Sequence, residues 1–144
     1  MRKIVLLLLI TLISCGEKKA KVIGIKDGDT ITVLLANNET KTLRLAEIDC
    51  PEKQQAFGMK AKQFTSSQVY GKYITFRTVT KDRYDREIAK VYYDGKYLSE
   101  EIVKVGFAWF YRRYSSNKKL DSLEHEAKRN NLGIWSDNNA IEPY

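Results

Sequence analysis

The chain has 144 residues, a formal net charge of +7, two cysteines and one histidine. This length suits one domain with one hydrophobic core. His125 cannot be both the acid and the base of a two-histidine ribonuclease, and together with Cys50 it offers too few nitrogen and sulfur ligands for a zinc site. The basic charge favours polyanionic partners, namely nucleic acid, anionic lipid or cell-wall polymer.

The N-terminus has the pattern of an export signal. A positively charged start precedes an apolar run at residues 4–13, which is too short to span a bilayer but has the length of a signal-peptide core. Ser14-Cys15 after this run resembles a bacterial lipobox, which implies cleavage before Cys15 and its acylation. We therefore expect a lipoprotein signal peptide at 1–14, a lipidated tether at 15–20 and an exported protein anchored to the cell envelope. The alternatives are a plain secretion signal and an uncleaved anchor.

Strands are predicted first along the rest of the chain. Alternating or β-branched residues predict strands at 21–26, 30–35, 40–48, 72–81, 88–93 and 96–98. Asp94-Gly95 between the last two is a hairpin-turn signal. The third strand is expected to end before Pro51, because proline cannot donate a hydrogen bond to a sheet.

Apolar residues at spacings of three and four predict three helices. They are Phe57, Ala61 and Phe64 in the first, Leu98, Ile102 and Val105 in the second, and Leu120, Leu123 and Ala127 in the third. Gly71 and Gly106 are placed to end the first two, and Ile134-Trp135 is expected to pack back onto the core. About five main strands, mostly antiparallel, with helices interposed and trailing, predict an α+β fold: an OB-fold five-stranded β-barrel with three α-helices. We expect this domain at 21–138 and a C-terminal tail at 139–144.

Two aspartates lie where predicted strands meet loops. Asp29 follows a tight turn, and Asp49 ends a strand twenty residues later. Two carboxylates, with main-chain carbonyls and waters, suit a hard cation such as Ca²⁺ or Mg²⁺. Taken alone, each aspartate is better explained as a turn residue, since aspartate commonly serves turns beside Gly or Pro.

Three further residues indicate phosphodiester chemistry. Arg44 lies on the predicted strand five residues before Asp49, and a guanidinium can hold a phosphate in bidentate fashion. Glu52 could orient or deprotonate a water molecule, and Arg86 offers a second guanidinium from a separate loop. A metal, two arginines and a carboxylate base are what the attack of water on a phosphodiester requires. The alternative for both arginines is a surface salt bridge or a phosphate contact without catalysis.

Four runs resemble, in order, the signature stretches of the thermonuclease (staphylococcal nuclease) family. They are IKDGDT at 25–30, LRLAEIDCPE at 43–52, KDRYDR at 81–86 and IWS at 134–136, with weaker matches at 57–61 and 105–108. The resemblance covers roughly residues 21–138, and several stretches in the right order are more specific than any one of them.

The resemblance implies an OB-type barrel with three helices and a complete set of site residues. Asp29 and Asp49 would bind Ca²⁺ with the main-chain carbonyl of Cys50, and Asp27 would lie near the metal. Glu52 would be the general base or water-positioning group, with Arg44 and Arg86 on the scissile phosphate. Arg83, Tyr84 and Tyr114 would line the nucleotide pocket. Such a monomer would hydrolyse DNA and RNA and leave 3′-phosphates. Its sequence preference would be weak, because every base has a face on which an aromatic ring can stack.

The chain departs from the family pattern at three positions. Cys50 stands where the best-known member has threonine, and Arg112 stands where that member has a pocket tyrosine. Asp85 stands where the family usually has glycine. If that position needs a positive φ, aspartate is one of the more tolerant substitutes.

Two other function classes compete with a nuclease. A membrane-anchored, non-catalytic OB-fold module that binds nucleic acid would share the basic aromatic surface, but would have no reason to keep Asp29, Asp49 and Glu52 together with Arg44 and Arg86. An envelope protein that binds acidic polymers through charge alone would need no metal and would lose affinity steeply with salt.

Overall fold

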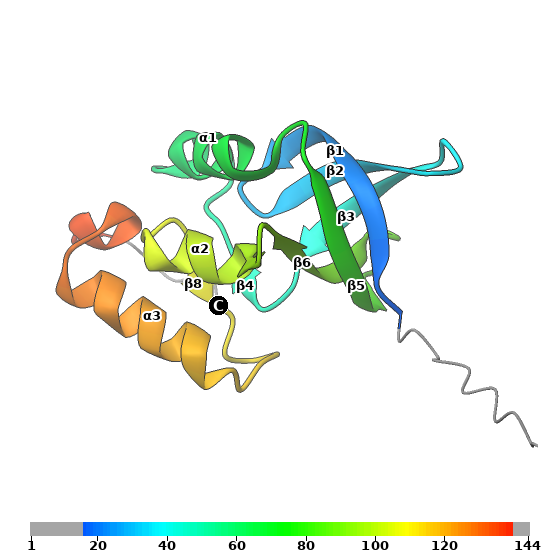
Figure 1. The fold of residues 1–144 in the computed structure, drawn as a ribbon. Helices are drawn as coiled ribbons and strands as arrows, with labels where there is room; N and C mark the ends of the chain where they lie inside the picture. The colour runs from blue at the N-terminus through cyan, green and yellow to red at the C-terminus, as the bar shows by residue number, and fades with distance from the viewer. Residues whose placement is uncertain (1–15, 140–144) are drawn as a thin grey trace, which may run out of the picture.

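A computed structural model describes residues 16–139. The expected signal peptide, the lipidation site Cys15 and nearly all of the expected tail lie outside the described residues. None of the helices within 16–139 has both the length and the apolar character needed to cross a membrane. Figure 1 shows the barrel strands on the right, α2 and α3 on the left, and α1 above them.

The elements follow the predicted order. The strands are β1 (Lys18–Asp27), β2 (Thr30–Leu35), β3 (Thr40–Leu45), β4 (Ile48–Asp49), β5 (Tyr73–Lys81), β6 (Glu87–Tyr93), β7 (Lys96–Tyr97) and β8 (Trp109–Phe110). The helices are α1 (Gly58–Val69), α2 (Leu98–Lys104), α3 (Lys118–Arg129) and a 3₁₀ turn, η1 (Gly133–Ser136).

Five strands close into a barrel. Antiparallel pairings run in the order β3-β2-β1-β5-β6, and a parallel pairing of β3 with β6, which sets Leu43 opposite Glu87, closes the ring. Alternate residues point inward, so Val22, Ile31 and Phe76 are fully buried in the core. The predicted OB-type barrel, mostly antiparallel and accompanied by three helices, is confirmed.

The helices lie where their apolar spacing predicts them. The first packs on β1, and α2 packs on β6 and α3. Gly71 and Gly106 follow α1 and α2 with positive φ values of 75° and 80°, a conformation that glycine adopts readily. Ile134 is buried, and the ring of Trp135 meets that of Trp109 edge-on at 6.5 Å, so this segment does return to the core.

Two predicted boundaries were wrong. The tether expected at 15–20 overlaps β1, which begins at Lys18, because Ala20 is buried and pairs with both Leu35 and Ile74. The strand expected at 40–48 divides after Leu45, and its last residue, Ile48, pairs with Phe110 of β8 instead.

The division after Leu45 has a backbone cause. Glu47 has a φ of 71°, which no strand residue adopts, so the chain turns there before Ile48 begins β4. A third difference concerns Glu87, which lies just outside the strand predicted at 88–93. It begins β6 and is buried, because Lys41 and Thr78 satisfy its carboxylate at 2.5 and 2.6 Å.

Candidate active site

The turn between β1 and β2 is clamped against α1. A Cβ atom on Gly28 would lie 2.8 Å from Cβ of Ala61 and 2.9 Å from Sγ of Cys50, so glycine is required there. The hydroxyl of Thr65 donates to the carbonyl oxygen of Gly28 at 2.6 Å. Asp29 follows, is buried, and accepts a hydrogen bond from the amide of Cys50 at 2.7 Å. This packing fixes the Asp29 carboxylate beside the main chain of Cys50.

Arg44 draws the two predicted metal ligands together. Its Nη2 lies 2.6 Å from Oδ1 of Asp49 and 3.3 Å from Oδ2 of Asp29. Its Nη1 donates to the carbonyl oxygens of Leu45 and Ile48 at 3.0 and 2.9 Å. The guanidinium is therefore held in place from two sides, and the carboxylates of Asp29 and Asp49 converge on one point.

The electrostatics of this cluster suit a cation. The pKa of Asp49 is raised to about 6, because burial and the charges of Asp29 and Glu52 raise it by more than the charge of Arg44 lowers it. Carboxylates that repel one another in a partly buried place are stabilised when a dication joins them. Among residues 16–139 no group of three or more His, Cys, Asp or Glu side chains is close enough to form a metal cage by itself. A hard cation such as Ca²⁺ would therefore take two carboxylates here and need main-chain oxygens and water to complete its coordination.

Glu52 and Asp27 lie at the edges of the cluster. Glu52 is exposed, three residues after Asp49, and its charge contributes to the raised pKa of Asp49. Its main chain packs against the start of α1, since a Cβ on Gly58 would come within 1.9 Å of the carbonyl oxygen of Glu52. Asp27 acts electrostatically on Cys50, whose thiol is kept protonated because burial raises its pKa.

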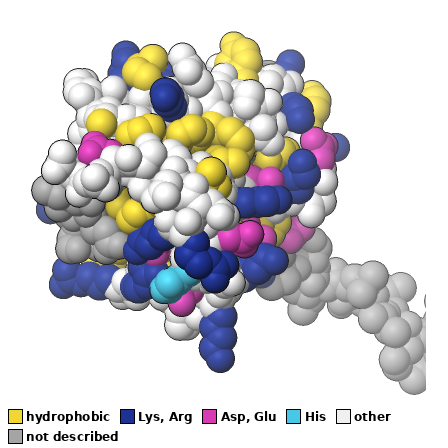
Figure 2. Space-filling model, turned by 90° about the vertical axis from the view of Figure 1, so that its left-hand side faces the viewer, with side chains coloured by type: hydrophobic (Ala, Val, Ile, Leu, Met, Phe, Trp, Pro, Cys, Tyr) yellow, Lys and Arg dark blue, Asp and Glu magenta, His cyan; other side chains and the backbone are white. Residues whose placement is uncertain are grey.

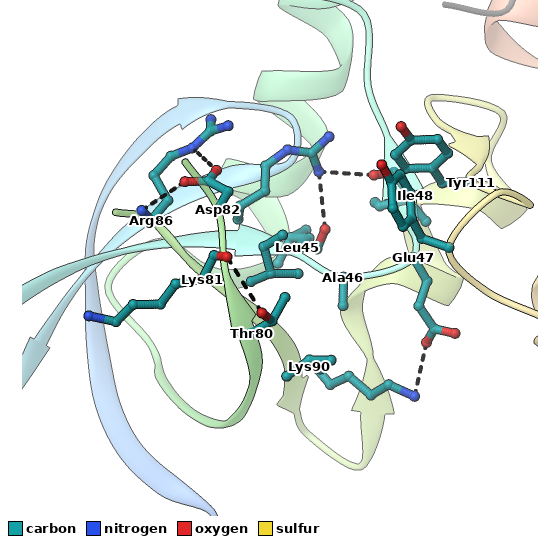
Figure 3. A pocket seen from close by; sticks show the side chains of 14 residues that line it. Leu45, Ala46, Glu47, Ile48, Thr80, Lys81, Asp82, Arg86, Lys90 and Tyr111 are labelled. Atoms are coloured by element: carbon teal, nitrogen blue, oxygen red, sulfur yellow. Dashed lines mark hydrogen bonds and ion pairs between the residues drawn. The ribbon is translucent and has the colours of Figure 1, made fainter. Parts of the chain in front are cut away.

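A pocket of about 630 Å³ opens beside Arg44. Arg44 and Arg86 both line it, as does Tyr114, and Figure 3 shows Arg86 and Tyr111 on opposite sides with Leu45 between them. The other lining residues are Ala46, Glu47, Ile48, Val79, Thr80, Lys81, Asp82, Ile88 and Lys90. Arg44 thereby joins the acidic cluster to a pocket with cationic and aromatic walls.

Asp82 holds the loop that carries Arg86. Its carboxylate accepts from Nε of Arg86 at 2.7 Å and from the amides of Tyr84 and Arg86 at 2.9 and 3.0 Å. Partial burial works to raise the pKa of Asp82, but these hydrogen bonds lower it below its ordinary value. Asp85 has a φ of 60°, so this position does need the positive φ that aspartate tolerates.

Arg83 and Tyr84 do not line the pocket. Both are exposed on the same loop, where the Tyr84 ring lies 4.9 Å from the guanidinium of Arg83 and 5.5 Å from that of Arg86. The loop therefore offers an aromatic ring and two guanidinium groups at the rim of the pocket.

The aromatic wall of the pocket contains a residue that the sequence reasoning missed. The rings of Tyr111 and Tyr114 meet at 4.6 Å and 78°. Arg112 does not line the pocket, and its guanidinium lies 2.6 Å from Asp121 and 2.5 Å from the buried Glu124. Tyr111, and not the neighbouring Arg112, thus lies in the pocket. The YRRY run at 111–114 was the available signal, and Asp82 and Glu47 carried none.

Basic side chains also cover part of the outer surface. In Figure 2 the Lys and Arg side chains gather mainly in the lower half of the face shown, over α3, while apolar side chains form a band above them. A polyanion approaching this side meets a positive field, which raises the rate of encounter.

The sequence is similar to those of known nucleases. The family model described as "Staphylococcal nuclease homologue" matches residues 42–137. The chain belongs to the staphylococcal nuclease family. This nuclease is 44% identical over 141 residues to an "Uncharacterized endonuclease" of Haemophilus influenzae. The match covers 96% of the chain and 79% of that protein.

Two further relatives are more distant. A "Micrococcal nuclease" of Shigella flexneri is 35% identical to this nuclease over 148 residues, covering 95% of the chain and 84% of that protein. An "Uncharacterized endonuclease" of Escherichia coli O157:H7 is 34% identical over 131 residues, covering 90% of the chain and 85% of that protein. The similarity thus includes the whole barrel and the elements that carry the site.

Proposed function

We propose that this nuclease is a Ca²⁺-dependent endonuclease that hydrolyses phosphodiester bonds of DNA and RNA with little sequence preference. The observation that carries the proposal is the double role of Arg44. It lies within 3.3 Å of both Asp29 and Asp49 and also lines the pocket that contains Arg86. A phosphate held between the two arginines would lie beside the acidic cluster.

The two arginines bind the reacting phosphate. Arg44 is fixed by two carbonyl oxygens and two carboxylates, and Arg86 is fixed by Asp82, so neither guanidinium has to be ordered when substrate binds. Such preorganised donors stabilise the negative charge that grows on the phosphoryl oxygens as water attacks. Arg86 also stabilises the leaving oxygen.

Asp29, Asp49 and the main-chain carbonyl of Cys50 would hold Ca²⁺, with Asp27 nearby. When bound, the ion supplies Lewis-acid polarisation of a phosphoryl oxygen. Glu52 orients the attacking water and accepts its proton. The exposure of Glu52 and its closeness to Asp49 support this role, because a general base must reach both water and the reaction centre.

The pocket accounts for broad substrate use. Tyr111 and Tyr114 present aromatic rings, and stacking on a ring accepts any base. The family resemblance implies products with 3′-phosphates. In that reaction water attacks phosphorus, the bond to the 5′-oxygen breaks, and the 3′-oxygen stays on phosphorus.

The test is cleavage of plasmid DNA and of RNA by the 144-residue chain in mild detergent, with Ca²⁺ and with chelator. We expect degradation with Ca²⁺ and none with chelator, and a fall in rate of about 10²–10³ in Glu52→Ser and Arg86→Ala, the usual loss for one preorganised group. Gel retardation without cleavage would instead support the non-catalytic binding module. End-labelling of the products, with and without phosphatase, identifies the terminal phosphate.

We propose in addition that the chain is exported and lipid-anchored through Cys15. The support is the apolar run at residues 4–13 followed by Ser14-Cys15. Cells fed radiolabelled palmitate should label the wild-type chain but not Cys15→Ala, and the label should fractionate with the envelope. Equal labelling of both chains, or of neither, contradicts the anchor.

A further inference from the structure

Glu47 connects the barrel to the aromatic wall of the pocket. It lies in the turn between β3 and β4, where its positive φ of 71° departs from both strands. Its side chain is only 11% exposed and lines the pocket that contains Arg44 and Arg86. Nothing in the chemistry proposed above uses this carboxylate.

Both ends of the tyrosine-bearing segment 111–115 are tied to Glu47. At the start, the amide of Tyr111 donates to the carbonyl oxygen of Glu47 at 2.8 Å. At the end, the hydroxyl of Ser115 donates to Oε2 of Glu47. Between them the amide of Tyr114 donates to the carbonyl of Tyr111 at 3.1 Å, which closes a turn. Glu47 therefore holds both ends of the segment that carries the two aromatic rings.

The Glu47 carboxylate is itself fixed from the other side of the pocket. Tyr97 donates its hydroxyl to Oε1 at 2.9 Å, and Nζ of Lys90 lies 3.1 Å from the same oxygen. Figure 3 shows Lys90 reaching Glu47 across the floor of the pocket, below Ala46. With donors from β6, β7 and the 111–115 segment, the side chain has little freedom to move.

The hydrogen bonds from Glu47 continue through Ser115 to the start of α3. Oγ of Ser115 accepts from the amide of Asn117 at 3.1 Å, and the Asn117 side chain caps α3 by accepting from the amides of Lys119 and Leu120. The segment is thus held between a rigid barrel turn and a capped helix. Besides Glu47, the β4–β8 pairing, the cap and the ion pairs of Arg112 with Asp121 and Glu124 restrain the segment.

We infer that Glu47 is a positioning residue that presents Tyr111 and Tyr114 to unstacked bases, and so sets the affinity of this nuclease for single-stranded nucleic acid. The inference rests on the proposed function for its substrate class. Glu47 acts through the segment and not on the phosphate, because its carboxylate oxygens already accept hydrogen bonds from Ser115 and Tyr97. Its loss should weaken binding while leaving the bond-breaking step nearly unchanged.

The first experiment compares KM and kcat for a single-stranded oligonucleotide in wild type, Glu47→Gln and Ser115→Ala. We expect KM to rise about 5- to 100-fold in Glu47→Gln, the range for losing one base–aromatic stack, while kcat stays within about 3-fold. Ser115→Ala removes only the end contact and should show a smaller rise in the same direction. Glu126→Gln, an exposed glutamate on α3, is the matched control and should change neither parameter.

A double-mutant cycle separates positioning from general stability. In a Tyr111→Ala/Tyr114→Ala background, Glu47→Gln should raise KM by less than about 2-fold, because residues that act as one unit are not additive. An undiminished effect there would show that Glu47 acts elsewhere and would overturn the inference. A fall in kcat at constant KM would overturn it as well.

A measurement of binding at equilibrium tests the role of Glu47 without any need for cleavage. The fluorescence anisotropy of a labelled oligonucleotide in chelator should show the same loss of affinity in Glu47→Gln. If the wild type binds but does not cleave in Ca²⁺, the proposed function fails while this measurement still decides the role of Glu47. Should Glu47→Gln not fold, Ser115→Ala and its cycle with Tyr114→Ala decide the question.

Discussion

Nη2 of Arg44 lies 2.6 Å from Oδ1 of Asp49, in a side-chain pair of which the arginine is 15% and the aspartate 24% exposed. The guanidinium that we propose binds phosphate and the carboxylate that we propose binds a cation are thus in direct contact. Each is oriented by the other before any ligand arrives. Removing either charge should therefore disturb both binding events.

Asp49→Asn tests this coupling. The variant removes one expected Ca²⁺ ligand charge and leaves Arg44 with a neutral partner, so the Ca²⁺ concentration for half-maximal activity should rise about 10-fold or more, comparable to losing a supporting group at a metal site. The measurement is a Ca²⁺ titration of cleavage rate. Asp94→Asn, an exposed turn aspartate with a side chain 65% exposed, is the control and should titrate like wild type. An unchanged titration in Asp49→Asn would remove this residue from the metal site.

Gly58→Ala tests the packing that supports Glu52. The added methyl group would meet the carbonyl oxygen of Glu52 at 1.9 Å, so the main chain of Glu52 must shift. We expect kcat to fall about 10²-fold, the loss that a misplacement of about 1 Å can cause. The matched change is Gly24→Ala, whose Cβ would lie at an ordinary 3.4 Å from Thr32 and should leave kcat unchanged. Full activity in Gly58→Ala would show that Glu52 need not be held there.

Asp82→Asn tests the support of Arg86. The neutral amide is a weaker acceptor for Nε of Arg86 and for the amides of Tyr84 and Arg86, so the guanidinium gains freedom. We expect kcat/KM to fall about 10-fold, less than in Arg86→Ala, because the guanidinium itself remains. Asp85→Asn makes the same change of charge in the same loop, at a side chain 88% exposed. The prediction fails if Asp85→Asn and Asp82→Asn lose equal activity.

Glu87→Gln tests the buried pair at the start of β6. Burial works to raise the pKa of Glu87, but Lys41 and Thr78 lower it below the ordinary value of 4.5. A carboxylate whose pKa is lower in the folded state stabilises the fold above its unfolded pKa. That contribution is lost as the pH falls through the folded pKa. Wild type should therefore lose stability below about pH 4.5 more steeply than Glu87→Gln.

The measurement is the free energy of unfolding by urea between pH 3 and pH 7. At pH 7 the variant should be less stable by about 1–3 kcal/mol, because the partly buried Lys41 loses its charged partner. Glu126→Gln, on the exposed face of α3, should follow wild type at every pH. Parallel pH profiles for Glu87→Gln and wild type would show that Lys41 stabilises the fold without this pairing.

Part of the site could be read from local patterns. The alternation of Thr40–Leu45 placed Arg44 on the face opposite Leu43 and Leu45, and the turn at Gly28 and the proline at Pro51 placed both aspartates at strand ends. Alternation and turn chemistry are properties of neighbouring residues, so they need no knowledge of the fold.

The sequence by itself determined the strand and helix order and the glycine-dependent turns, and it supplied the charged residues of the proposed site. Only the tertiary structure decided that Glu47 turns the chain with a positive φ, that Asp82 holds Arg86, and that Tyr111 and not Arg112 enters the pocket. These outcomes depend on contacts between residues up to 68 positions apart, such as Ser115 with Glu47. No periodicity encodes such contacts, because they arise when separate strands and loops compete for the same space and the same hydrogen-bond donors.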